Sequence, residues 1–162
     1  MESWNDFAVA LAGASAALAG LIFVAVSINL ERLLRIPAMR FRAATTIAML
    51  TGVLVLSSFI LIPGQSIRAL GLETLGAGAA SWIVVTALGV RSVRLVDADA
   101  AYRTNYVVSV LTHQCATAPV VIGGIILTRS DDAGMYWLAA AFIASFVVAL
   151  AEAWVILVEI AR

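Results

Sequence analysis

Apolar residues gather in five long runs that are separated by short polar stretches. The runs are Phe7 to Leu30, Ala43 to Ile62, Ala69 to Val90, Asn105 to Thr128 and Met135 to Val158. A helix needs about 20 mainly apolar residues to cross about 30 Å of hydrocarbon. Because a backbone inside lipid must satisfy its own hydrogen bonds, each run is predicted to be a membrane-spanning helix. The pattern therefore predicts an all-α transmembrane bundle that forms a single domain over residues 1–162.

The third run is the weakest of the five, because it contains Glu73 and four glycines, so four spans are an alternative. The placement of the arginines distinguishes five spans from four, since short cytoplasmic loops are enriched in Arg and Lys. With the N-terminus outside, five spans place eight of the ten arginines inside, whereas four spans divide them five and five. The eight inner residues are Arg32, Arg35, Arg40, Arg42, Arg91, Arg94, Arg103 and Arg162. Five spans with a cytoplasmic C-terminus are therefore preferred.

Composition supports a membrane protein. The chain is 63% hydrophobic and only 12% charged, far from the balance of a water-facing surface. Its formal net charge is zero, which excludes the basic footprint of a nucleic-acid-binding protein. The first run is long and follows the acidic residues Glu2 and Asp6, unlike a secretory signal with a basic start. It is interpreted as a permanent span, and the chain as a multi-pass protein of a bacterial inner membrane.

Two charged connections lie on the predicted inner side. Residues Glu31 to Arg42, around Pro37, are predicted to continue the first helix at the level of the inner headgroups. Asp97 and Asp99 form a mixed-sign loop together with Arg91, Arg94 and Arg103, which is interpreted as a solvated connection.

Small residues recur on one side of the first run. Ala8, Ala12, Ala16 and Gly20 are spaced four apart, which aligns them on a helix and permits close approach of another helix. The strip has two interpretations: it packs the bundle within one chain, or it forms a contact in a homo-oligomer. The spacing does not distinguish them.

His113 and Glu152 are the candidate functional residues, because ionisable side chains at membrane depth are costly and rare. From the helical rise, His113 is expected about 5 Å and Glu152 about 7 Å to the inner side of the span midpoints. A hydrogen-bonded pair between them is predicted as a proton or ion site, since imidazole titrates near neutrality. Alternatively, Glu152 is protonated, or satisfied by Gln114, Thr112 or a serine on another helix.

The helix that carries His113 has a polar face. Ser109, Thr112 and His113 follow helical i, i+3, i+4 spacing, and Gln114 is adjacent. Pro119, further along, removes a backbone donor and frees the carbonyl of residue 115. The kink is predicted either to line a hydrated cavity or to be a tolerated bend.

Motifs for enzymatic chemistry are missing from the sequence. It contains no nucleotide-binding glycine loop, no HExxH and no CxxC. One histidine and one cysteine do not supply the usual ligands of a zinc site, so no metal and no cofactor are expected. The chain is expected not to be an enzyme.

The N-terminal region resembles a known group of proteins. Three segments are similar to the opening of small uncharacterised multi-span inner-membrane proteins of actinobacteria and related bacteria. They are Ser3-Trp4-Asn5-Asp6-Phe7, the run from Gly13 to Leu21, and Ser27-Ile28-Asn29-Leu30. The resemblance covers roughly the first 35 residues. It implies a bacterial inner-membrane protein and brings no activity, cofactor or catalytic residue.

These observations lead to a functional hypothesis. The chain is predicted to be a homo-oligomeric membrane protein that conducts or senses a small ion or proton through His113 and Glu152. The alternative is a non-catalytic accessory or scaffold subunit that binds another membrane protein through its small-residue face.

Overall fold

The fold is known from a computed structural model that describes residues 2–95 and 100–161. Within these ranges, the side chains of residues 2, 3, 32, 100–103 and 156–161 are outside the description. The predicted mixed-sign connection at Asp97 and Asp99 also lies outside the described residues.

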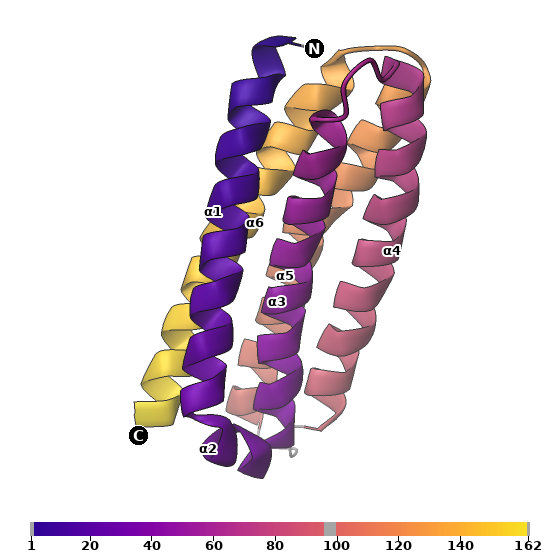
Figure 1. Ribbon diagram of the computed structural model, residues 1–162. Coiled ribbons are helices and arrows are strands. Elements are labelled where there is room, and N and C mark those ends of the chain that lie inside the picture. The colour runs from indigo at the N-terminus through magenta and orange to yellow at the C-terminus, as the bar shows by residue number, and fades with distance from the viewer. Residues whose placement is uncertain (1, 96–99, 162) are drawn as a thin grey trace.

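Five long helices run side by side, and a short sixth helix lies at one end of the bundle (Figure 1). They are α1 (Glu2–Ile28), α2 (Leu30–Arg35), α3 (Pro37–Ile60), α4 (Ile67–Arg94), α5 (Ala100–Thr128) and α6 (Ala133–Ala161). All except α2 are long and apolar enough to cross a membrane, which confirms the predicted five-helix transmembrane bundle. The doubtful third run forms α4, a continuous helix of 28 residues. The two chain ends lie at opposite ends of the bundle, as an odd number of crossings requires.

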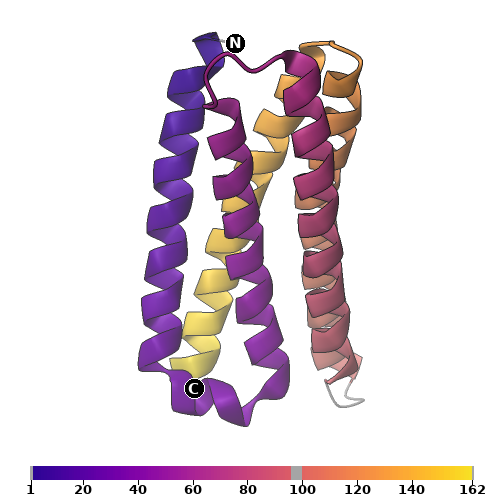
Figure 2. The same cartoon turned by 45° about the vertical axis from the view of Figure 1, so that its right-hand side comes forward.

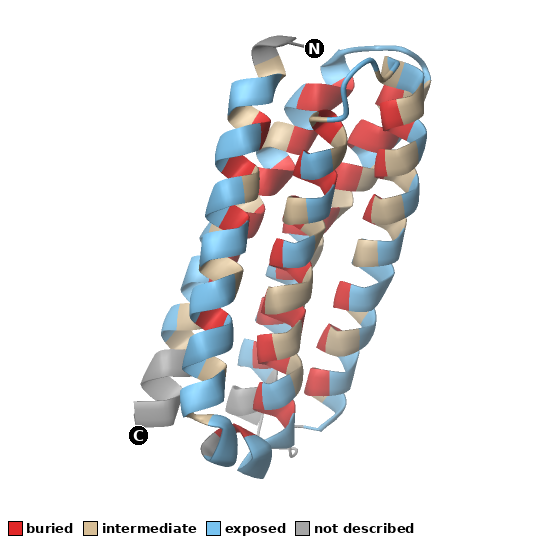
Figure 3. Ribbon diagram, in the orientation of Figure 1, coloured by how far each residue is buried: buried red, intermediate tan, exposed pale blue. Residues whose placement is uncertain are grey.

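The centre of the bundle is α3. It packs against α1, α4 and α6, while α5 packs between α4 and α6. Half of the most apolar stretch of α3 is buried, compared with 17% of that of α1. Helix α1 accordingly stands at the edge of the bundle in both views (Figures 1 and 2). Its buried residues form a narrow stripe toward the interior, flanked by partly buried residues, and most of the remaining surface is exposed (Figure 3).

Local chemistry sets the helix ends. Pro37 occupies the first turn of α3, where its missing N–H has no helical partner to lose. Between α3 and α4 the backbone turns at Gly64 with φ of 71°, a conformation that glycine adopts without strain. Ser66 then caps α4 by accepting a hydrogen bond from the amide of Ala69 at 3.2 Å.

One boundary differs from the sequence prediction. Residues Pro37 to Arg42 form the first turns of α3 instead of an interfacial extension of the first helix. The physical reason is that proline is favoured at the first position of a helix, so Pro37 starts a span. As a result, Arg42 belongs to a membrane-spanning helix.

The small-residue strip of α1 is divided between the interior and the surface. Ala8 is fully buried and Ala12 is partly buried, whereas Ala16 and Gly20 are exposed. A Cβ added at Gly20 would meet no atom within 4 Å. Only the first part of the strip therefore packs against this chain.

Glycine allows α4 and α5 to approach closely. A Cβ added at Gly71 would lie 2.4 Å from the backbone nitrogen of Thr128. A Cβ at Gly124 would lie 2.9 Å from the backbone nitrogen of Leu75. Gly71 is one of the four glycines that make the third run a weak candidate for a span. The structure shows that α4 needs this glycine in order to pack against α5.

We predict that Gly71→Ala destabilises the bundle, because the added methyl group forces the two backbones apart. The expected cost is about 1–3 kcal/mol, typical of overpacking. The measurement is the thermal unfolding midpoint of the detergent-purified protein. Gly76→Ala, on the same helix, is the matched control, because a Cβ added there would meet no atom within 4 Å, and it should leave the midpoint unchanged or slightly raised. Equal midpoints for Gly71→Ala and the unaltered protein would contradict the packing argument.

Candidate functional site

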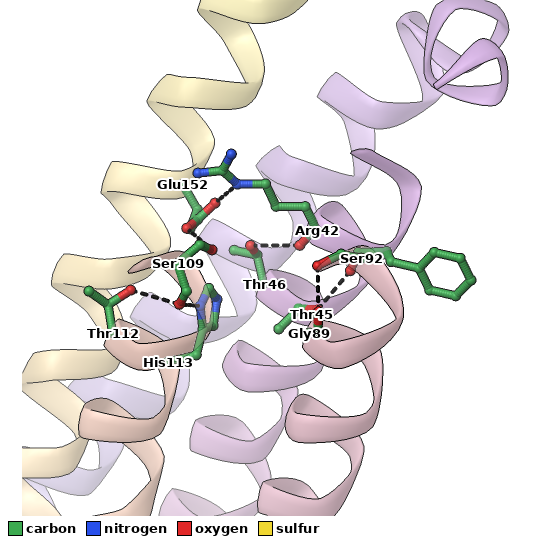
Figure 4. Close-up of polar contacts among 10 residues, drawn as sticks. Arg42, Thr45, Thr46, Gly89, Ser92, Ser109, Thr112, His113 and Glu152 are labelled. Atoms are coloured by element: carbon green, nitrogen blue, oxygen red, sulfur yellow. Dashed lines mark hydrogen bonds and ion pairs between the residues drawn. The ribbon is translucent and has the colours of Figure 1, made fainter. Parts of the chain in front are cut away.

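A buried ion pair joins α3 to α6 near the α2 end of the bundle (Figure 4). The Nε–H of Arg42 donates to Oε2 of Glu152. Both residues are buried, with relative exposures of 8% and 5%. Charges at such depth persist when they are paired and hydrogen-bonded. The pair explains how both side chains are held in spans that are otherwise mainly apolar.

The second oxygen of the carboxylate is also satisfied. Ser109, on α5, donates its hydroxyl to Oε1 of Glu152 at 2.6 Å. The guanidinium carbon of Arg42 lies 5.3 Å from the ring centroid of Tyr106, a cation–π arrangement. Glu152 therefore contacts α3 and α5 from its position on α6, and three helices meet at one carboxylate.

His113 lies one helical turn beyond Ser109 and is only 2% exposed. Its Nδ1 lies 2.6 Å from the carbonyl oxygen of Ser109. Because a carbonyl can only accept, Nδ1 must carry the proton of this hydrogen bond. The other ring nitrogen, Nε2, is buried and has no hydrogen-bond partner.

The prediction that His113 and Glu152 form a hydrogen bond with each other is therefore wrong. Glu152 bonds to Arg42 and Ser109, and His113 bonds to the backbone of Ser109. Ser109 links them indirectly, since its hydroxyl contacts the carboxylate and its carbonyl contacts the imidazole. The two candidates do share one site, as their similar depth indicated.

A cavity lies beside the ion pair. Its lining includes Arg42, Thr45, Ser92, Ser109 and His113. The space that the centre of a water molecule can occupy in this cavity has a volume of about 10 Å³. A space of this size with several polar walls suits about one water molecule. The hydroxyls of Thr45 and Ser92 each donate to a carbonyl on their own helix, so their oxygens can still accept.

A second small cavity lies further along α5. It is also about 10 Å³, and its walls include the hydroxyl-bearing residues Ser81, Thr117 and Ser145. Thr117 is one turn from His113 and donates to its carbonyl at 2.8 Å. Polar side chains of α4, α5 and α6 thus line a second space inside the bundle, beyond His113.

The other predicted site residues lie outside this cluster. The side chains of Gln114 and Trp82 form a hydrogen bond between α5 and α4, and Gln114 also donates to Thr86 at 2.8 Å. Thr112 is exposed and donates to the carbonyl of Ser109. Pro119 lies within α5, which continues through it, and it lines neither internal cavity.

Arg42 is the functional residue that sequence reasoning missed. The sequence predicts an inner-side charge at this position, because the apolar run begins only at Ala43. Proline at the first helical position is the signal that could have found it. A helix that begins at Pro37 carries Arg42 into its second turn, at the level where the partner spans place Ser109 and Glu152.

Comparison of the chain with protein families, curated proteins and solved structures finds no match. Among the described residues, no three His, Cys, Asp or Glu side chains are grouped so that they could hold a metal ion. The site is therefore interpreted from its geometry.

We predict that Glu152→Gln destabilises the bundle, because it removes the carboxylate that is paired with the buried guanidinium of Arg42. Breaking a buried pair in this way costs about 3 kcal/mol or more. Replacing both partners, as in Arg42→Met with Glu152→Leu, should recover most of that loss. The measurement is unfolding of the purified protein, with the exposed Arg40→Met as the control. A double variant less stable than Glu152→Gln would contradict the assigned pairing.

Proposed function

We propose that this chain is a multi-pass protein of a bacterial inner membrane that senses or conducts protons. The observation that carries the proposal is the free, buried Nε2 of His113, which lies at a cavity that also borders the buried Arg42–Glu152 pair. An imidazole nitrogen without a hydrogen-bond partner keeps a free lone pair, which can accept a proton. We assign the chain no catalytic role.

The size of the internal cavities favours a proton over a hydrated ion. Each cavity has about 10 Å³ for water centres, room for about one water molecule. A proton needs only ordered hydroxyls, waters and a titrating group, whereas an ion with its hydration shell needs more space. His113 borders one cavity and Thr117 borders the other. The two residues are one turn apart on α5, so the two cavities lie next to each other along this helix.

Protonation of His113 has a defined electrostatic consequence. Among the described residues, the charged side chain at its cavity is Arg42 from α3, which is paired with Glu152 of α6, while the residues that α4 contributes to the cavity are uncharged. An imidazolium would place a second cation beside Arg42 and compete for the carboxylate of Glu152. Acid therefore weakens the contact between α3 and α6, and higher pH restores it.

We predict that proton flux into reconstituted vesicles rises as the pH is lowered, because protonation of His113 weakens the contact between α3 and α6. His113→Asn should remove this pH dependence, because the asparagine side chain does not titrate. The measurement is the initial rate reported by an enclosed pH-sensitive dye under an imposed potential.

Gln114→Leu is the matched control, since Gln114 is the polar neighbour of His113 but bonds to Trp82 and Thr86 on α4. It should keep the pH profile of the unaltered protein. A flux that does not depend on pH, or one that His113→Asn leaves unchanged, would contradict the proposal.

The proposal includes an orientation and an assembly. The excess of arginine at the α2 end supports a cytoplasmic C-terminus and an external N-terminus. Exposed Ala16 and Gly20 support close packing of α1 against a helix of another chain. A second copy makes the protein a homo-oligomer. A different membrane protein in that place would make it an accessory or scaffold subunit, which is the second candidate.

We predict that Gly20→Cys, made with Cys115→Ser, forms disulfide-linked dimers when cells are oxidised in their membranes. Two copies that meet at α1 would bring the two thiols together. Leu11→Cys in the same background is the control, because Leu11 is buried within the chain. Electrophoresis without reductant is the measurement. Adducts with another protein would favour the accessory subunit, and no adduct from Gly20→Cys would contradict contact at this face.

A further inference from the structure

The outer face of α4 carries a long groove. Its volume is about 420 Å³, and its walls are formed by Trp82, Ile83, Thr86, Ala87 and Val90, with Arg91 and Arg94 at one end. The walls are thus apolar along most of the groove, and both charges gather at the α2 end. This distribution matches a ligand with one long apolar part and one anionic group.

The two arginines are available to a ligand. Arg91 and Arg94 are exposed and three residues apart, so they share one side of the helix. The ion pairs among the described residues join Arg35 to Glu31 and Arg42 to Glu152, and neither involves Arg91 or Arg94. Two guanidinium groups can bind the oxygens of a phosphate by charge-assisted hydrogen bonds.

The opposite end of the groove is held in place by side-chain hydrogen bonds. The indole N–H of Trp82 donates to Gln114 on α5, and Gln114 donates to Thr86. Trp82 lies near the middle of α4, although tryptophan usually prefers the headgroup level. Gln114 satisfies the indole N–H at this depth, so the ring can serve as a fixed apolar wall.

The length of the groove fits one leaflet. Trp82 and Arg94 are separated by 12 residues of continuous helix, which is about 18 Å at 1.5 Å per residue. Half of the hydrocarbon thickness is about 15 Å. A lipid whose phosphate lies at the arginines would therefore extend its acyl chain to the bilayer midplane, where Trp82 stands.

We propose that the α4 groove, formed by Trp82, Ile83, Ala87, Val90, Arg91 and Arg94, is a binding site for an anionic phospholipid. The phosphate lies between Arg91 and Arg94, and one acyl chain lies along the apolar walls. Because both arginines are cationic, the site prefers phosphatidylglycerol to a zwitterionic lipid of the same chain length. This site is separate from the His113 cavity and does not depend on the proposed function.

The test uses a variant in which Trp82 is the only tryptophan, made by Trp4→Phe, Trp137→Phe and Trp154→Phe. It is reconstituted in phosphatidylcholine bilayers with small amounts of chain-brominated lipid, which quenches fluorescence on contact. Brominated phosphatidylglycerol should quench Trp82 at a lower mole fraction than brominated phosphatidylcholine. Adding Arg91→Gln and Arg94→Gln should remove this preference, with a loss of about fivefold for each arginine.

The controls separate the possible outcomes. Arg68→Gln with Arg129→Gln removes two exposed arginines outside the groove and should leave the preference intact. Ala87→Phe fills the groove and should reduce quenching by both lipids. Free glycerol phosphate should not compete, because it lacks the acyl chain. Equal quenching by both lipids, a preference that survives loss of both arginines, or competition by glycerol phosphate would each overturn the assignment.

Discussion

The architecture depends on one constraint: a carboxylate and a guanidinium inside a membrane bundle must stay together. Neither Arg42 nor Glu152 tolerates an apolar neighbourhood alone, so their pairing fixes the positions of α3 and α6 relative to each other. Ser109 adds α5 to the same contact. Packing of small and apolar residues supplies the rest of the association, but it specifies depth and register less sharply than this polar contact does.

His113 gives this constraint a chemical consequence. The imidazole is held by the carbonyl of Ser109, and its second nitrogen is buried without a partner. Arg42, His113 and Ser109 all border one cavity with room for about one water molecule. A proton added there changes the charge balance that joins three helices. The same residues thus serve stability and the proposed response, which links a local titration to the packing of the bundle.

The sequence predicted the helices well and the contacts between side chains poorly. Hydrophobic run length identified all five spans, and arginine placement retained α4 despite its glycines. Depth estimates brought His113 and Glu152 to one level. The sequence does not identify Arg42 as a partner of Glu152, because the apolar run begins at residue 43, whereas α3 begins at Pro37. Which hydroxyl or guanidinium contacts Glu152 depends on helix rotation, which a single sequence does not specify when most of each helix surface is apolar.

The central claim is that His113 binds a proton beside the ion pair. His113 is the single histidine of the chain, so ¹⁵N labelling of histidine reports on it alone. Solid-state NMR in lipid bilayers measures which ring nitrogen carries hydrogen as the pH is lowered. The account predicts a neutral imidazole protonated at Nδ1 at high pH and an imidazolium at low pH. A histidine protonated at Nε2 alone, or one that stays neutral at every pH at which the bundle remains folded, would contradict it.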